Sequence, residues 1–228
     1  MESVKEMARH SPQQGHVQFL PEGLRQGSMT RHLKSCKSRA GEDTPRRGRR
    51  PAKGFHVIVE GKEEKDYWMH LEVPANARLE DPDDFLRETW LECCGRLSAF
   101  TIGDVEYFNY PVESYDQDMS HRIGRLLDVG SRFIHEYDFG TMTELSLRIV
   151  WEGNIQSRDI RILARNLPPA LACYSCGAPA TKALAMWRYF DERFVCDDCA
   201  IREAGEDDEG MMLPLVNSPR VGTCAYTG

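Results

Sequence analysis

The chain of 228 residues contains no apolar run that approaches the roughly 18 residues of a membrane span. Its N-terminal segment, residues 1–7, lacks the apolar stretch of a secretory signal peptide. We therefore expect a cytoplasmic protein without membrane contacts, whose eight cysteines stay reduced. Hydrophobic residues make up 41% of the chain and charged residues 29%, which is typical of a globular protein with one ordinary domain and smaller appendages.

The sequence also lacks the common catalytic motifs, since it has no P-loop, no dinucleotide-binding fingerprint and no HExxH motif. Residues 138–140 spell the kinase triplet DFG, but without a Gly-rich loop or an HRD segment we interpret them as a turn between strands. Cys93 or Cys94 could be a nucleophile with His121 or His135 as its base. Cys93 falls on the apolar stripe of a predicted helix, where free cysteine is commonly buried. We therefore predict no catalytic residue, and the sequence leaves enzymatic activity open.

Positive charge is scarce outside the N-terminal segment. Residues 1–53 contain twelve Lys and Arg against five Asp and Glu, a net charge of +7, whereas the whole chain carries −7, so residues 54–228 carry −14. A basic arm on an acidic body favours either nucleic-acid binding by the arm or folding of the arm back on its own domain. Pro, Gly and Ser within residues 37–53 predict a flexible linker, which could follow phosphates or stay solvated without a ligand. The candidate nucleic-acid contacts are Arg31, Lys34, Arg46, Arg47, Arg49 and Arg50.

Two CxxC pairs near the C-terminus give the most specific signal in the chain. Cys173 and Cys176 are followed, after nineteen residues, by Cys196 and Cys199. This spacing predicts a tetrahedral site with four thiolate ligands and one zinc ion per chain. Two disulfides or a redox motif are the alternatives. Because four protein ligands leave no open position, we interpret the site as structural, within a small zinc ribbon or knuckle module at residues 168–228.

A second, incomplete metal-binding pattern lies in the basic arm. His32 and Cys36 have the HxxxC spacing of small C2HC zinc fingers, in which both side chains lie on one face of a short helix. Where two earlier cysteines would be expected, this chain has His16 and Phe19. At most His16, His32 and Cys36 remain as ligands. The alternative is a degenerate finger whose helix survives as a basic surface element.

Two smaller features complete the candidate sites. Asp116, Asp118 and His121 could form an oxygen-rich metal site, but they lie on a polar loop whose usual environment is solvent. Cys224 belongs to neither CxxC pair. It could pack as a small apolar residue beneath the C-terminal tail, or approach the zinc.

Residues 54–167 predict the main folded domain. A helix is expected from Asp81 as N-cap and Pro82 at the first helical position, with an apolar stripe from Phe85 to Cys93 and a stop at Gly95. One main helix among mostly antiparallel strands predicts an α+β fold, β-grasp-like, with the helix packed on one face of the sheet. The expected strands are 55–60, 67–73, 98–108, 132–137 and 144–152, with an edge strand at 158–164 and a short helical turn at 123–127.

Three motifs of this domain occur in an order that resembles a known family. They are residues 67–73 (YWMHLEV), 90–95 (WLECCG) and 135–140 (HEYDFG). With them, the chain resembles the plasmid pRiA-type ORF-three-like family of prokaryotes, whose members are often labelled passenger proteins of insertion elements. The resemblance implies an α+β body, a C-terminal zinc-bearing module and a mobile-element context, and brings little agreed function. It covers residues 54–165 and extends to 213–222 and 226–228 in the tail.

These features together favour a non-enzymatic zinc-binding adaptor of a mobile-element or defence context. We expect it to bind a protein partner, and nucleic acid through its basic arm. The alternatives are an enzyme with an unrecognised active site in the central domain, and a DNA-binding regulator that uses the N-terminal finger. The sequence does not determine the partner or the oligomeric state.

Overall fold

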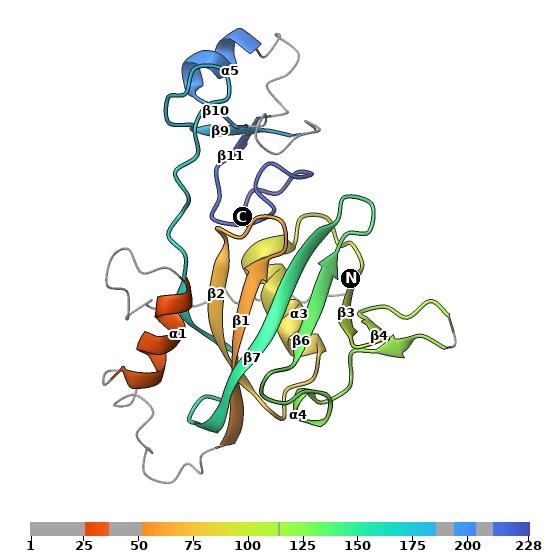
Figure 1. The fold of residues 1–228 in the computed structure, drawn as a ribbon. Helices are drawn as coiled ribbons and strands as arrows, with labels where there is room; N and C mark the ends of the chain where they lie inside the picture. The colour runs from red at the N-terminus through yellow and green to blue at the C-terminus, as the bar shows by residue number, and fades with distance from the viewer. Residues whose placement is uncertain (1–25, 37–51, 114, 186–193, 204–211) are drawn as a thin grey trace, which may run out of the picture.

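The structure is a computed structural model and describes residues 26–36, 52–113, 115–185, 194–203 and 212–228. In these ranges the chain forms one large sheet, a helix on each face of it and a small second sheet near the C-terminus (Figure 1). None of the helices in the described ranges combines the length and the apolar character needed to cross a bilayer.

The large sheet has eight strands in the order β5-β4-β3-β6-β7-β1-β2-β8. All neighbouring strands are antiparallel except β4 and β5, which are parallel. This mostly antiparallel sheet with few helices agrees with the predicted α+β class. The strands are β1 (Ala52–Gly61), β2 (Trp68–Pro74), β3 (Ser98–Ile102), β4 (Val105–Phe108), β5 (Gln117–Asp118), β6 (Arg132–Tyr137), β7 (Thr143–Ile155) and β8 (Arg161–Arg165).

Most predicted strands are present, and one is divided. The segment predicted as a single strand over 98–108 is a hairpin of β3 and β4, in which Ile102 pairs with Val105. Gly103 adopts a φ of 62°, a left-handed conformation that glycine tolerates in two-residue hairpin turns. The predicted edge strand is β8, which lies at one end of the sheet order.

The main helix covers one face of the sheet, as predicted. It consists of α3 (Glu80–Leu86) followed by the π-helical turn η1 (Arg87–Leu91), and Trp90 is fully buried against the core. The helix begins earlier than predicted: its N-cap is Leu79, and not Asp81. The Asp81 carboxylate instead accepts a 2.7 Å hydrogen bond from the backbone N–H of Arg78. Gly95, with a φ of 69°, follows the helix, where a left-handed residue favours its end.

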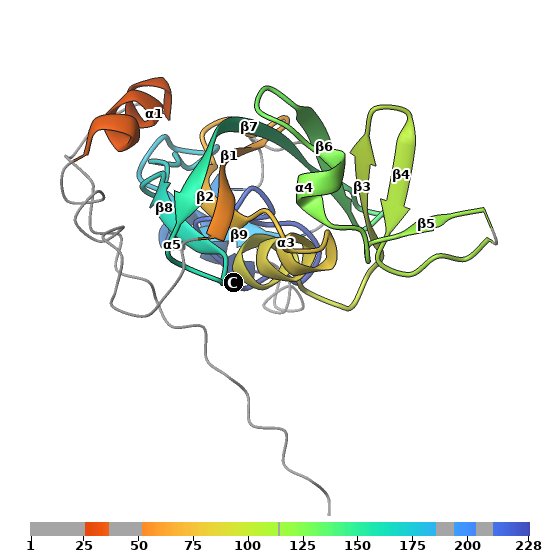
Figure 2. The ribbon, with the colours of Figure 1, turned by 90° about the horizontal axis from the view of Figure 1, so that it is seen from below.

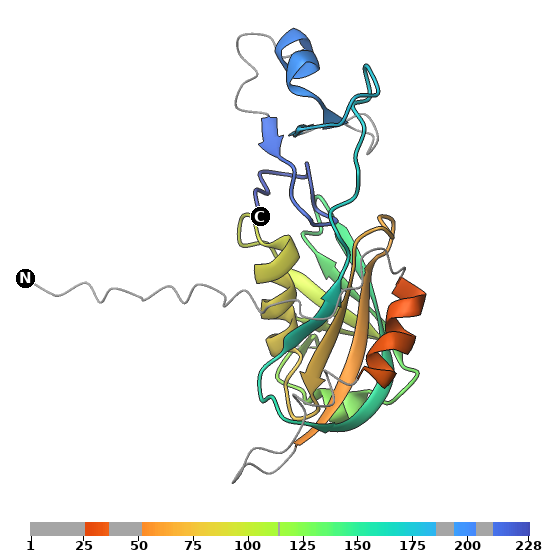
Figure 3. The ribbon, with the colours of Figure 1, turned by 90° about the vertical axis from the view of Figure 1, so that its left-hand side faces the viewer.

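A second helix, α1 (Gln26–Ser35), covers the opposite face of the sheet (Figure 3). Met29 and Leu33, one helical turn apart, are 0% and 2% exposed and form a buried cluster with three residues of the sheet. The predicted basic surface element is therefore an amphipathic helix that also stabilises the domain, with Arg31 and Lys34 exposed. The sheet residues of this cluster are Trp68, Leu163 and Ala164.

The C-terminal region leaves the large sheet, forms a small module and then returns. The module contains a three-stranded antiparallel sheet in the order β10-β9-β11 and the short helix α5. After it, the Asn217 side chain bonds with Asn166 and the Ser218 hydroxyl donates to the backbone carbonyl of Trp90. The module is thus tied to the body at both its entry and its exit. The remaining elements are α4 (Ile123–Leu126), β9 (Lys182–Leu184), β10 (Phe194–Val195), α5 (Asp197–Glu203) and β11 (Met212–Pro214).

Candidate metal centre

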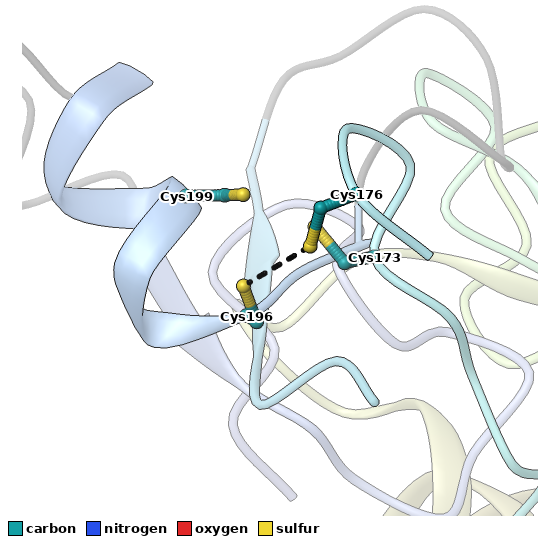
Figure 4. Close-up of side chains that lie close together, drawn as sticks. All are labelled: Cys173, Cys176, Cys196 and Cys199. Atoms are coloured by element: carbon teal, nitrogen blue, oxygen red, sulfur yellow. Dashed lines mark hydrogen bonds between the residues drawn. The ribbon is translucent and has the colours of Figure 1, made fainter. Parts of the chain in front are cut away.

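The four cysteines of the two CxxC pairs point toward one common centre (Figure 4). Their sulfur atoms all lie within 4.8 Å of one another, and Cys176 Sγ is 3.6 Å from Cys196 Sγ. Four sulfurs at zinc–sulfur bond lengths of about 2.3 Å in a tetrahedron are about 3.8 Å apart. The predicted ligand set, Cys173, Cys176, Cys196 and Cys199, is therefore assembled at a spacing that can hold a metal ion.

A tight turn brings the first two sulfurs together. The backbone N–H of Cys173 donates to the carbonyl of Ala178 at 2.7 Å, and that of Gly177 donates back to the Cys173 carbonyl at 2.8 Å. Gly177 has a φ of 74°, which a side chain would make costly. Cys173 is buried, whereas Cys176 is exposed, so of these two ligands only Cys176 faces solvent.

The start of α5 supplies the other two sulfurs. Cys196 directly follows β10, and its carbonyl accepts a 2.9 Å hydrogen bond from the N–H of Ala200. Cys199 lies three residues further along, inside α5 (Asp197–Glu203), and is buried. The Thr181 hydroxyl donates to Asp197 Oδ1 at 2.9 Å, which ties the helix start to the segment before β9. The ligand positions are thus fixed by a strand, a helix start and a turn.

Local charges and donors adjust the thiols. Burial opposes ionisation of Cys173, but backbone N–H donors, first among them that of Cys196, outweigh it and lower the pKa of this thiol to about 6. Burial and the neighbouring thiols raise the pKa of Cys199 to about 12. A metal cation would remove that proton, because coordinating thiols are deprotonated. Arg202 donates a 2.7 Å hydrogen bond to Cys199 Sγ and offsets negative charge on the sulfurs.

The second predicted metal site is incomplete in the part of the chain that the structure describes. His32 and Cys36 are half-buried at the C-terminal end of α1. Among the described residues, they join no group of three His, Cys, Asp or Glu side chains at ligand distance. His16, the third predicted ligand, lies outside the described residues, as does Phe19.

The alternative of a cysteine nucleophile paired with a histidine base is not realised for Cys93 and His135. The partners of Cys93 Sγ are the thiols of Cys94 and Cys224 and the guanidinium of Arg220. His135 Nε2 instead bonds with the carboxylate of Asp83 at 2.6 Å, and both residues are buried. The pleat of β6 directs His135 into the sheet core, where its partner is Asp83 rather than a cysteine.

The three residues considered as an oxygen-rich site do not come together as one ligand group, although two of them are neighbours. His121 Nδ1 lies 3.6 Å from Asp118 Oδ1, and both side chains are largely exposed. The Asp116 carboxylate instead accepts backbone hydrogen bonds from Val112 and Glu113 at 3.0 and 2.9 Å. Asp116 therefore stabilises its own loop and joins no ligand group with the other two.

A basic cavity at the base of β1 was missed by the sequence analysis. It has a volume of about 540 Å³, and its lining includes Lys53, Arg122, Arg125 and Arg158. Lys53 pairs with Glu152 at 3.0 Å, whereas no ion pair within the described ranges engages the three arginines. A cluster of free guanidinium groups on a body of net charge −14 is an anion-attracting surface.

Close backbone packing holds two of these arginines in place. The N–H of Gly124 donates to the carbonyl of Ala75 at 2.9 Å, and a Cβ at Gly124 would lie 2.7 Å from that oxygen. Gly124 therefore lets α4 dock against the turn after β2, with Arg122 and Arg125 on either side of the contact. The pattern Arg-x-x-Arg was the available sequence signal.

Of the predicted nucleic-acid contacts, Arg31 and Lys34 are exposed on α1, and Arg46, Arg47, Arg49 and Arg50 lie outside the described residues.

A buried ion pair anchors the C-terminal tail to the turn after β6. Arg220 is 0% exposed and donates to Asp138 Oδ2 at 2.6 Å, to the Thr141 carbonyl and to the Thr143 hydroxyl. Burial opposes ionisation of Asp138, but Arg220 and two backbone N–H groups hold the pKa of its carboxyl below the ordinary value. Residues 138–140 thus form a turn, as predicted, with Asp138 at a φ of 62°.

No family model matches the chain, and no curated protein matches it. Among solved structures, it is similar to a crystal structure of a protein of unknown function from Methanosarcina mazei Go1, with 14% sequence identity and a TM-score of 0.40. The match covers 45% of this chain, and the chain spans 61% of that protein.

Proposed function

We propose that this chain is a non-enzymatic, zinc-binding adaptor of the cytoplasm that contacts nucleic acid and a protein partner on different surfaces. The observation that carries the proposal is the basic cavity, because it concentrates free arginines on an otherwise acidic body. We retain the plasmid and mobile-element context, the β-grasp-like description of the body and the ribbon description of the small module as parts of the proposal. The order of the three sequence motifs supports the mobile-element context, the order of helices and strands supports the β-grasp-like description, and the CxxC spacing supports the ribbon description.

Zinc is the metal that best suits the four cysteines. Thiolates favour zinc among the common divalent ions, and zinc takes four ligands in structural sites. Because all four positions come from the protein, no position remains for a substrate or a reactive water. Structural zinc supplies about 10–16 kcal/mol in small zinc-binding peptides, enough to fold a module with so little apolar core.

The nucleic-acid surface combines the cavity with the arm. Lys53 lies at the start of β1 and lines the cavity. Arg50 precedes it by three residues, so even an extended chain keeps their Cα atoms within about 11 Å. The basic residues of the arm and the arginines of α4 can therefore contact one phosphate backbone. Phosphate contacts of this kind supply affinity rather than sequence specificity.

The connection between β4 and β5 is the surface that we assign to a protein partner. Tyr110, Val112 and Tyr115 are 68%, 71% and 77% exposed on this short segment. It extends away from the edge of the sheet (Figure 2). Exposed aromatic residues are enriched at protein interfaces, whereas single exposed apolar residues are common elsewhere.

Fluorescence anisotropy with labelled DNA and RNA tests the nucleic-acid contact. The full chain is titrated at several salt concentrations and compared with Arg122→Ala/Arg125→Ala. The control is Arg132→Ala/Lys65→Ala, which removes the same charge from exposed positions outside the cavity. If both cavity arginines contact phosphates, the slope of log affinity against log salt falls by about 1.4–1.8, since each contact contributes about 0.7–0.9.

Equal binding by the two double variants contradicts the cavity as the contact surface. Replacement of Arg46, Arg47, Arg49 and Arg50 by alanine separates the contribution of the arm from that of the cavity arginines and keeps α1 and β1 intact. Turnover of a substrate by the purified chain, lost on mutation of a single cavity residue, would contradict the non-enzymatic proposal as a whole.

A further inference from the structure

A second group of three cysteines forms beside the C-terminal tail, separate from the two CxxC pairs. Its members are Cys93 and Cys94, which follow η1, and Cys224, which is 130 residues further along the chain. Their sulfur atoms lie within 4.8 Å of one another, with 3.1 Å between Cys93 and Cys94 and 3.9 Å between Cys94 and Cys224. These distances are well above the S–S bond of about 2.05 Å, so the thiols are free.

We propose that Cys93, Cys94 and Cys224 bind a soft monovalent cation of the Cu(I) type through three thiolates. Thiolates select soft ions, and three sulfurs around a metal at bond lengths of about 2.3 Å lie about 4.0 Å apart in a trigonal plane. The Cys94–Cys224 separation already fits this spacing. The sulfurs of Cys93 and Cys94, which are 3.1 Å apart, would have to move apart by about 1 Å.

Accessibility distinguishes this group from packed core cysteines. Cys94 is exposed, and Cys93 and Cys224 are half-buried, so an ion can reach the sulfurs from solvent. Cys224 has a φ of 54°, a left-handed conformation that is unfavourable for residues other than glycine. Strained residues of this kind are concentrated at functional sites, where the surrounding contacts hold them in place.

The surroundings offer no fourth protein ligand within the described ranges. The three cysteines form a complete group at ligand distance, without a His, Asp or Glu. The nearby carboxylates are engaged, since Glu92 accepts hydrogen bonds from the N–H of Cys94 and from Tyr137, and Asp138 pairs with Arg220. A structural zinc ion requires four ligands, whereas a three-thiolate site suits an ion that accepts fewer.

Positively charged side chains lie beside the three sulfurs and offset the negative charge of the metal-bound form. Three thiolates around a monovalent cation carry a net charge of −2. The buried guanidinium of Arg220 donates to Cys93 Sγ at 3.4 Å, and that of Arg96 hydrogen-bonds to the Cys94 thiol. Two guanidinium groups therefore face the sulfurs and offset this charge.

The test uses the full chain, loaded with zinc and kept reduced and free of oxygen. Cu(I) is supplied in complex with bicinchoninate, whose colour reports transfer, while a zinc indicator reports displacement of the zinc. We expect one equivalent of Cu(I) to bind per chain with the zinc retained. X-ray absorption should then show three sulfur ligands around copper.

Cys224→Ser and the exposed Cys94→Ser should each weaken this binding by at least about 100-fold, since losses outside the ligand shell alone cost about 10–100-fold. Cys36→Ser, which removes a cysteine outside both groups, should leave it unchanged. Circular dichroism verifies that each variant is folded. The proposal is overturned if Cu(I) displaces the zinc, if Cys224→Ser and Cys94→Ser bind as tightly as the unmodified chain, or if no copper is taken up.

Discussion

Replacement of Arg220 by methionine is the most informative test of how the C-terminal tail is held. Arg220 is fully buried, donates four hydrogen bonds and lies 4.8 Å above the ring of Tyr137. Methionine keeps much of the aliphatic volume but leaves the Asp138 carboxylate buried without its counter-ion. Removing one partner of a buried ion pair costs about 3–5 kcal/mol. We therefore expect Arg220→Met to lower the free energy of unfolding by this amount.

The assay is equilibrium unfolding of the zinc-loaded chain in urea at pH 7, followed by tryptophan fluorescence. Arg132→Met places the same substitution at an exposed site and should change the free energy by less than about 0.5 kcal/mol. In Asp138→Asn/Arg220→Met neither charge is left unpaired, so the combined loss should be smaller than the sum of the single losses by about 0.5–3 kcal/mol. A loss below about 1 kcal/mol for Arg220→Met, or additive single losses, would refute the reasoning.

Two further predictions concern the opposite face of the sheet and the pH dependence of the tail. Leu33→Ala opens a cavity between α1 and the sheet and should cost about 2–5 kcal/mol in urea unfolding, whereas the exposed Lys34→Ala should cost almost nothing; equal effects would contradict the docking of α1. The pKa of Asp138 is lowered in the folded state, so its contribution to stability is complete above the ordinary value of 3.8 and is lost as the pH falls through the lowered value. The difference in unfolding free energy between the unmodified chain and Asp138→Asn should therefore be constant above about pH 5, roughly one pH unit above the ordinary pKa of 3.8, and should shrink in more acidic solution. A difference that does not depend on pH would contradict the ion pair.

Features that depend on nearby residues could be predicted from the sequence. The alternation of apolar and polar residues at 67–73 and 144–152 predicted the strands β2 and β7. Successive side chains of a strand point to opposite faces of the sheet, whichever strand lies beside it, so the pattern is visible in the local sequence. The CxxC spacing likewise predicted that four cysteines come together at a spacing that can hold a metal ion, since each pair is a local turn and both pairs offer the same ligand chemistry.

Features that depend on distant contacts could not be predicted. Arg220 meets Asp138 across 82 residues and Cys224 meets Cys94 across 130 residues, and no local pattern encodes these pairings. The packing of α1 had a visible signal in Met29 and Leu33, which are spaced by one helical turn. That signal was overlooked because His32 and Cys36 suggested a metal-binding finger instead.

The metal content of the purified full chain tests the central claim most directly. Mass spectrometry of the native protein should show one zinc ion per chain, and X-ray absorption should show four sulfur ligands at about 2.3 Å. Cys173→Ser/Cys176→Ser should lose this zinc, whereas Cys36→Ser should retain it. A chain that carries no zinc, or that keeps it after loss of Cys173 and Cys176, would contradict the account.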